Sequence, residues 1–346
     1  MRAKRFMAIA VLTLLCVACS CKKQHHTVTR GFYYWKTTYK PTVYERNVLR
    51  NLQVRKMYTR LFDIDLDPAT HQPIPIAPIQ FPSTIADTFE FVPVVFITQN
   101  TLIVLNEKGI GSLAIKTSAF IEAICNNAGI HSNEIQIDCD WTAGTKDIYF
   151  KLLSALKQQP YFKGKTLSCT LRMHQVKFTT SSGIPPVDKA MLMCYSMGDI
   201  KKPGERNSIL DVELAKSYLH KINLYPLPLD IALPVYEWCV LFRDDKYRGI
   251  LHDVTSAMVT GSSLFVNKKG SLYTCEADTL WQGYPLKAKD VIRVENVFFN
   301  DLVEIARFTS QQVTRPDMNV LLFSCDSITL AKYLPDELEA VYNAYR

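Results

Sequence analysis

The sequence predicts an α/β protein built as a (β/α)8 TIM-type barrel, with an irregular second unit and an excursion before the last strand. Three observations support this fold class. Eight strand-like runs alternate with mostly helical segments along the 346 residues. Strands such as 91–98 are apolar throughout, which is typical of a sheet covered on both faces. No glycine-rich phosphate loop follows any strand, which disfavours a nucleotide-binding fold. An open, doubly wound sheet is the alternative.

The strand-like runs are rich in β-branched and aromatic residues or are apolar at nearly every position. We expect them at residues 31–39, 56–65, 91–98, 134–141, 166–176, 190–197, 229–242 and 319–324. The helical segments repeat apolar side chains at the spacing of an α-helix. We expect helices at 44–53, 111–128, 145–158, 208–222, 298–312 and 335–345, with Ser208 as the N-cap of the fourth.

Two segments depart from the regular alternation. The proline-rich stretch 67–82 has no helical periodicity, so the second helix of the barrel is expected to be missing or degraded. Residues 244–285 have the pattern of short strands and turns and form the expected excursion. The predicted organisation is a signal peptide at 1–18, a lipidated tether at 19–29 and a single barrel domain at 30–346.

The N-terminus has the features of a bacterial lipoprotein signal. Basic residues at positions 2, 4 and 5 precede the apolar stretch 7–15, which is too short to span a bilayer. Small residues then lead to Cys19, as in a lipobox, with Cys21 as the second choice and an ordinary cleaved signal peptide as the alternative. Lipidation of Cys19 predicts a cell-envelope protein anchored to a bacterial membrane, with the outer membrane as the favoured site.

Composition argues against several other classes of protein. The formal net charge is +7, but no dense basic run occurs beyond Lys22–Lys23, so nucleic acid is not an expected partner. Seven of the ten cysteines follow the signal region without a CxxC pair, so a thiolate zinc site is not expected. No cofactor is expected either. The expected partners are a membrane, through the lipid anchor, and a carbohydrate.

Polar residues alternate at the ends of the fourth and fifth strands, where barrel enzymes carry their chemistry. Gln136, Asp138 and Asp140 share one face of the fourth strand. Arg172 and His174 share a face of the fifth strand, next to this acidic set. Asp138 and Asp140 are candidate catalytic residues, because neighbouring carboxylates raise the pKa of one of the pair. A structural salt bridge to Arg172 is the alternative.

Other strand ends add candidates for the same site. Asp63 closes the second strand and is the third candidate catalytic carboxylate. Aromatic rings near strand ends suit stacking on the apolar face of a sugar, although for any single ring a place in the core is the favoured interpretation. The candidate substrate-binding residues are Arg172, His174, Tyr195, Trp35, Gln136, Asp65 and Glu237.

The run Asp138-Cys139-Asp140-Trp141 resembles the DxxDxDxE strand of chitinase-type glycoside hydrolases of family 18. The resemblance implies a barrel whose fourth strand ends in a proton-donating Glu, with the Asp residues tuning that chemistry. In this sequence Ile135 and Thr142 stand at the two outer positions of the motif. A broader resemblance, carried by FYYWKT, EIQIDCDWT and LPLDIALPVYEW, is to uncharacterised bacterial lipoproteins with a glycoside-hydrolase-like barrel.

Three functions follow as hypotheses. A glycosidase-like hydrolase would oppose Asp138 or Asp140 to a second carboxylate about 5 to 9.5 Å away. A non-catalytic barrel that binds a glycan or an envelope partner is favoured by Thr142. A metal-dependent hydrolase using Asp138, Asp140 and His174 is the weakest, because such sites usually contain more histidines. Carboxylates facing each other across an open cleft would favour hydrolysis, whereas acids sealed by Arg172 would favour binding.

Overall fold

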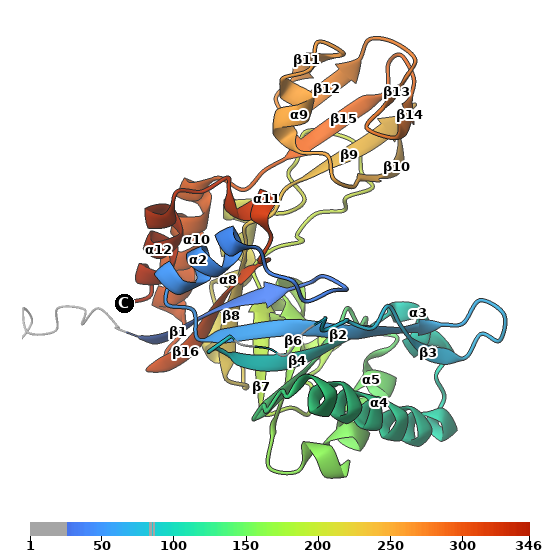
Figure 1. Cartoon of the computed structure of the whole chain (residues 1–346), viewed down its shortest axis with the longest axis vertical. Helices are drawn as coiled ribbons and strands as arrows, with labels where there is room; N and C mark the ends of the chain where they lie inside the picture. The colour runs from blue at the N-terminus through green and yellow to red at the C-terminus, as the bar shows by residue number, and fades with distance from the viewer. Residues whose placement is uncertain (1–25, 83–84, 86) are drawn as a thin grey trace, which may run out of the picture.

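The computed structural model describes residues 26–82, 85 and 87–346 (Figure 1). The expected signal peptide, together with Cys19 and Cys21, lies outside these residues, as does most of the expected tether. In the part of the chain that is described, no helix is both long and apolar enough to cross a membrane.

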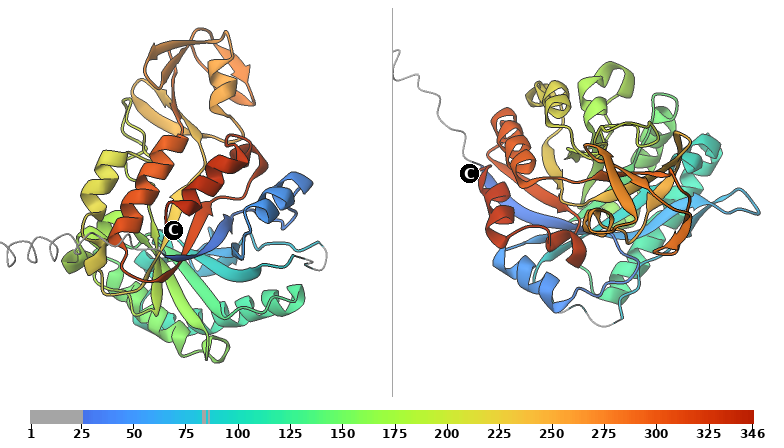
Figure 2. Two further views of the ribbon diagram at one scale, coloured as in Figure 1. Left: turned by 90° about the vertical axis from the view of Figure 1, so that its left-hand side faces the viewer. Right: turned by 90° about the horizontal axis from the view of Figure 1, so that it is seen from above.

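A closed barrel of eight parallel strands forms the body of the molecule and confirms the predicted fold class. Each strand pairs with the next along the chain, and β1 pairs with both β2 and β16, which closes the sheet. Helices surround this barrel when the molecule is seen from above (Figure 2). The barrel strands are β1 (Thr27–Tyr34), β2 (Lys56–Leu66), β4 (Glu90–Ile97), β5 (Glu134–Cys139), β6 (Thr166–Arg172), β7 (Lys189–Met193), β8 (Leu229–Pro234) and β16 (Asp317–Phe323).

The helices outside the barrel begin and end at recognisable signals. Helix α2 opens with a capping box formed by Thr42 and Glu45. Helix α4 begins after Asn106, whose side chain accepts from the backbone of Gly109, and ends at Gly129 with a φ of 68°. The helices are α2 (Val43–Asn51), α3 (Gln99–Val104), α4 (Glu107–Ala128), α5 (Lys146–Lys157), α6 (Met173–Lys177), α7 (Thr179–Ser182), α8 (Val212–Leu219), α10 (Phe299–Gln312), α11 (Ser327–Leu330) and α12 (Pro335–Asn343), with 3-10 turns at Pro160–Phe162 and Ile222–Leu224.

The second barrel unit is irregular, as expected. Among the described residues between β2 and β4 there is no helix, and strand β3 (Pro73–Ile76) instead pairs antiparallel with β2. The prolines at positions 73 and 75 are compatible with this position, because an edge strand leaves one row of backbone groups unpaired.

Three predictions about single elements are wrong. The expected strand 166–176 ends at Arg172, and the chain then turns into α6. The expected strand 229–242 is two strands, β8 and β9, which belong to different sheets, because the chain leaves the barrel after Pro234. Ser208 does not cap a helix. Asp211 caps α8, while Ser208 donates to Glu295.

The segment between β8 and α10 forms a second, smaller sheet that stands apart from the barrel (Figure 1). Its strand order is β10-β9-β15-β12-β11, antiparallel throughout, with a separate β13–β14 hairpin. We call residues 238–295 the insertion. Its elements are β9 (Trp238–Arg243), β10 (Lys246–Leu251), α9 (Ser256–Thr260), β11 (Phe265–Lys269), β12 (Leu272–Cys275), β13 (Thr279–Trp281), β14 (Tyr284–Leu286) and β15 (Val291–Glu295).

Arg293 connects the insertion to the loop that follows β7. Its fully buried guanidinium contacts Glu295 at 2.6 Å and donates to three backbone carbonyls of the loop. These carbonyls belong to Ile200, Lys202 and Gly204, at 2.7 to 3.2 Å. A buried charge with this many partners fixes the loop in place, because each carbonyl would otherwise need a partner of its own.

A layer of ion pairs closes the barrel interior near the starts of the strands. The Lys189 ammonium lies 2.8 Å from both Glu134 and Asp230, which are almost completely buried. Tyr58 also donates to Glu134, and Asn319 donates to Asp230 from its backbone and its side chain. The two buried carboxylates therefore share the Lys189 cation and accept hydrogen bonds as well, while Lys56 at 3.6 Å from Glu134 and Arg315 at 3.9 Å from Asp230 are more distant cations.

Replacing Lys189 with Met should lower the free energy of unfolding by about 3 to 5 kcal/mol, because two buried carboxylates then lose their shared cation. Urea unfolding followed by circular dichroism measures the loss. Lys163→Met, at an exposed position, serves as the matched control and should change stability by less than about 0.5 kcal/mol. Equal stability of the two variants would contradict this role of the ion-pair layer.

Candidate functional site

The carboxyl ends of β5 and β6 bring the predicted acidic and basic residues together. Parallel pairing of the two strands sets Gln136 beside Ser168, so the polar faces of both strands point into the barrel. Asp138 lies further along β5 and Asp140 directly follows this strand, towards the end of the barrel where its strands finish. We call this end the mouth.

Asp138 accepts a hydrogen bond and lies in surroundings that disfavour its charged form. The Thr170 hydroxyl donates to its Oδ1 at 2.5 Å. Burial raises the pKa of Asp138 to about 7, and the charges of Asp140 and Asp63 act in the same direction. Thr170 and Arg172 oppose this shift only in part. Asp138 is therefore a carboxyl group that exchanges its proton near neutral pH.

Asp140 forms an ion pair with Arg172 instead of standing free. Arg172 Nη2 donates to Asp140 Oδ2 at 2.6 Å, and Nε lies 2.6 Å from Oδ1. Both side chains are about one-third exposed, so the pair sits at the open surface of the mouth. The salt bridge considered from the sequence is thus present, and it involves Asp140 and not Asp138.

The other two predicted acids of this region have local partners. Asp63 accepts from Arg60 Nε at 2.6 Å. Asp65 accepts from the Thr98 hydroxyl at 2.8 Å, and Thr98 is the N-cap of α3. Asp65 therefore supports the start of a helix. Asp63 is close enough to act on the pKa of Asp138, and its own charge is compensated by Arg60.

Gln136 lies deeper in the barrel than the acids. Its Oε1 accepts from the Tyr33 hydroxyl at 2.6 Å, and the side chain is fully buried. Gln136 thus links the acidic strand to β1 and forms part of the floor beneath the mouth.

An aromatic cluster lies at the ends of the first, sixth, seventh and eighth barrel strands, on the side of the barrel away from β5. Phe323 is at its centre, with ring centroids 5.5 to 5.6 Å from four neighbours. Sequence reasoning identified two members, Trp35 and Tyr195, and missed the rest. The cluster consists of Tyr33, Trp35, Tyr195, Tyr236 and Phe323.

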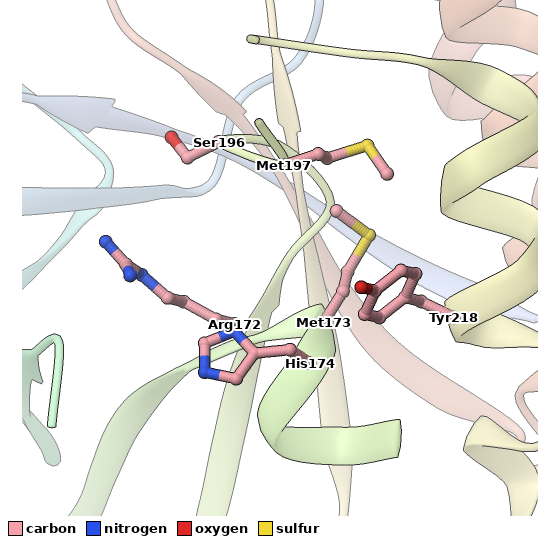
Figure 3. A pocket seen from close by; sticks show the side chains of 6 residues that line it. All are labelled: Arg172, Met173, His174, Ser196, Met197 and Tyr218. Atoms are coloured by element: carbon pink, nitrogen blue, oxygen red, sulfur yellow. The ribbon is translucent and has the colours of Figure 1, made fainter. Parts of the chain in front are cut away.

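A small cavity opens beside the Asp140–Arg172 pair (Figure 3). Its volume is about 200 Å³, and its lining comes from the ends of β6 and β7 and from α8. His174 lines it from the first turn of α6, not from the strand on which it was expected. Burial and the nearby Arg172 charge lower the pKa of His174. The lining residues are Arg172, Met173, His174, Ser196, Met197 and Tyr218.

Glu237 does not join the acids of the mouth. It lies on the link between β8 and β9, where it accepts a hydrogen bond from Ser256 and lies 3.4 Å from the Lys332 ammonium. Its neighbours Tyr236 and Trp238 face the other way, with ring centroids 5.2 Å apart. The alternation that places these two aromatic residues at the mouth thus directs Glu237 away from it.

Thr142, at the position where the chitinase motif has its Glu, is engaged in a local network. Its hydroxyl lies 3.1 Å from Gln99 Nε2 and 3.3 Å from the Thr145 hydroxyl. Across the described residues, no group of three His, Cys, Asp or Glu side chains is arranged to hold a metal ion. The seven described cysteines are all buried and unpaired.

The raised pKa of Asp138 predicts a pH-dependent stability. Between about pH 4 and pH 7 the unfolded chain gives up a proton that the folded protein keeps, so the stability of the wild type falls as pH rises through this range. The variant Asp138→Asn has no carboxyl group to titrate at this position. Above pH 7 its free energy of unfolding should therefore exceed that of the wild type by about 2 to 4 kcal/mol. Urea unfolding from pH 4 to 8 measures the difference. A carboxyl carbon resonance of Asp138 that titrates near pH 4 would contradict it.

Comparison with known proteins supports the architecture. No protein-family model and no curated protein sequence matches the chain. Among solved structures, the spore cortex-lytic enzyme SleL of Bacillus megaterium matches with a TM-score of 0.55 at 11% identity, over 94% of this chain and 76% of that one. SleL of Bacillus cereus matches with a TM-score of 0.53 at 14% identity, over 93% of this chain and 75% of that one.

Ostrinia furnacalis Group IV chitinase, in complex with allosamidin, matches with a TM-score of 0.54 at 11% identity, over 92% of this chain and 97% of that one. At such low identities the similarity establishes the fold alone. The chain therefore has the TIM-barrel fold that these chitinase-like glycoside hydrolases share.

Proposed function

We propose that this chain is an envelope lipoprotein whose barrel mouth binds a glycan without cleaving it. The observation that carries the proposal is the neutralisation of the mouth acids. Arg172 pairs with Asp140, and Arg60 pairs with Asp63. The raised pKa of Asp138 keeps a large fraction of this carboxyl protonated at neutral pH. Neither Asp63 nor Asp140 is therefore a free carboxylate that could act beside a protonated Asp138, as glycoside hydrolysis generally requires.

The remaining features of the mouth suit recognition of a sugar. Aromatic rings such as Trp35 and Phe323 offer flat apolar surfaces to the carbon-hydrogen faces of a sugar ring. Opposite them, Asp138, Thr170 and the Asp140–Arg172 pair offer hydrogen-bond donors and acceptors. Small-ligand sites usually combine an apolar or aromatic lining with a few well-placed polar groups, and the mouth has both.

Hydrolysis is the second candidate, and one observation favours it. A carboxyl group whose pKa is about 7 has the property required of a general acid at neutral pH. In that case Asp138 would protonate the leaving oxygen, and Asp140, released from Arg172 by the substrate, would take a proton from the water that attacks the anomeric carbon.

Two variants separate these functions. Under the binding proposal, Trp35→Ala should weaken glycan binding about tenfold or more, by loss of stacking, whereas Asp140→Asn should change it only a few-fold. The assays are calorimetric titration and release of reducing ends from soluble glycans of envelope and dietary origin. No reducing ends should appear with the wild type. Release by the wild type that disappears in Asp140→Asn would establish hydrolysis and overturn the binding proposal.

The membrane anchor is proposed from the signal sequence. Basic residues, a short apolar stretch and small residues before Cys19 together support lipid attachment at that thiol. Cys19→Ala should abolish incorporation of labelled palmitate and shift the protein from the detergent phase to the aqueous phase on phase separation. Cys21→Ala is the matched control and should keep the label. Label that is lost only in Cys21→Ala would move the lipid site to position 21.

A further inference from the structure

A second and larger cavity lies where the insertion meets the barrel. We call it the junction cavity. Its volume is about 670 Å³, which is within the range of small-ligand sites. Four segments of the chain build it: the link from β8 to β9, the start of α9, the chain from the end of β15 into α10, and the chain from the end of α11 into α12 (Figure 1). Its lining residues are Glu237, Ser256, Ala257, Asn296, Val297, Phe298, Phe299, Asn300, Lys332, Tyr333 and Glu337.

The junction cavity is separate from the mouth. No residue that lines it also lines the cavity beside Asp140. The link between β8 and β9 separates the junction cavity from the mouth. Tyr236 packs on Phe323 in the mouth, whereas Glu237 lines the junction cavity. Trp238, the next residue on the mouth side, donates from its indole nitrogen to Glu295 at 3.0 Å.

One part of the junction cavity contains a pair of opposite charges that compensate each other. The Glu237 side chain is 9% exposed and lies 3.4 Å from the Lys332 ammonium. The Ser256 hydroxyl contacts this carboxylate and lies 2.9 Å from Asn296 Oδ1. Burial lowers the pKa of Lys332. Because the carboxylate and the ammonium offset one another, this part of the cavity favours a polar ligand without net charge.

The rim of the junction cavity adds an apolar surface and further hydrogen-bonding groups. Phe298 is 64% exposed and lies next to Val297 and Phe299 in the lining. Asn300 is exposed beside it. Tyr333 is buried, and its hydroxyl donates to the Val297 carbonyl at 2.7 Å, which fixes the wall. An exposed ring beside amide, hydroxyl and carboxylate groups matches the two faces of a sugar.

We propose that the junction cavity binds a neutral saccharide unit, as a second site distinct from the mouth. The proposal shares its ligand class with the glycan binding proposed for the mouth, but none of its residues. The Glu237 carboxylate accepts hydrogen bonds from sugar hydroxyl groups, Ser256 and Asn296 accept from them or donate to them, and the ring of Phe298 packs against the carbon-hydrogen face.

The test is calorimetric titration of the full-length lipidated protein, in a detergent without a sugar head group, with pentasaccharides of N-acetylglucosamine, glucose and mannose. At least one of these should bind at two sites. Phe298→Ala combined with Asn300→Ala should weaken one site tenfold or more and leave the other unchanged. Leu280→Ala, which removes an exposed apolar side chain from the tip of the insertion, is the matched control and should change neither.

Trp35→Ala distinguishes the two proposals. If both hold, this variant loses the mouth site and keeps the junction site, which the double variant at Phe298 and Asn300 then removes. If only the junction proposal holds, Trp35→Ala changes nothing. The junction proposal is overturned if the double variant binds all three pentasaccharides as the wild type does, or if the wild type binds none of them.

Discussion

The constraint on which the rest of the structure depends is the placement of polar side chains on the inner face of a closed barrel. Glu134, Gln136, Asp138 and Asp140 alternate along β5, so all four point into the barrel interior. A buried polar group needs a partner, and each of the four finds one on another strand. The ion-pair layer at the base, the floor around Gln136 and the paired acids of the mouth are successive levels of one polar column.

Much of this column could be predicted from the sequence, because strand alternation alone places Asp138 and Asp140 on one face and Arg172 beside them. Two site residues were misplaced for local reasons. The spacing of LRMHQ fits a strand or a helical turn, so His174 was assigned to a strand that in fact ends at Arg172. The apolar run 229–242 conceals a change of sheet after Pro234, and with it the separate location of Glu237.

The aromatic cluster shows a different limit of sequence reasoning. Tyr33 shares the parity of Trp35, so alternation could have included it. Phe323 ends an apolar strand in which nothing distinguishes a ring at the mouth from a ring in the core. Its central place depends on β16 returning between β1 and β8, which is a consequence of barrel closure and not of local pattern. The same closure brings the rings to face the acids, and so gives the mouth the two unlike walls on which the proposed glycan binding rests.

Strand β1 enters the barrel at Thr27, next to Asp317 at the start of β16, and therefore at the end opposite the mouth. The start of β1 and the mouth therefore lie at opposite ends of the barrel. With the lipid that we propose on Cys19, the attachment would lie towards the end of the barrel that holds the ion-pair layer, and the mouth and the insertion would lie towards the other end. Such an orientation favours polymers that approach from outside the lipid surface over lipid-linked sugars held within it.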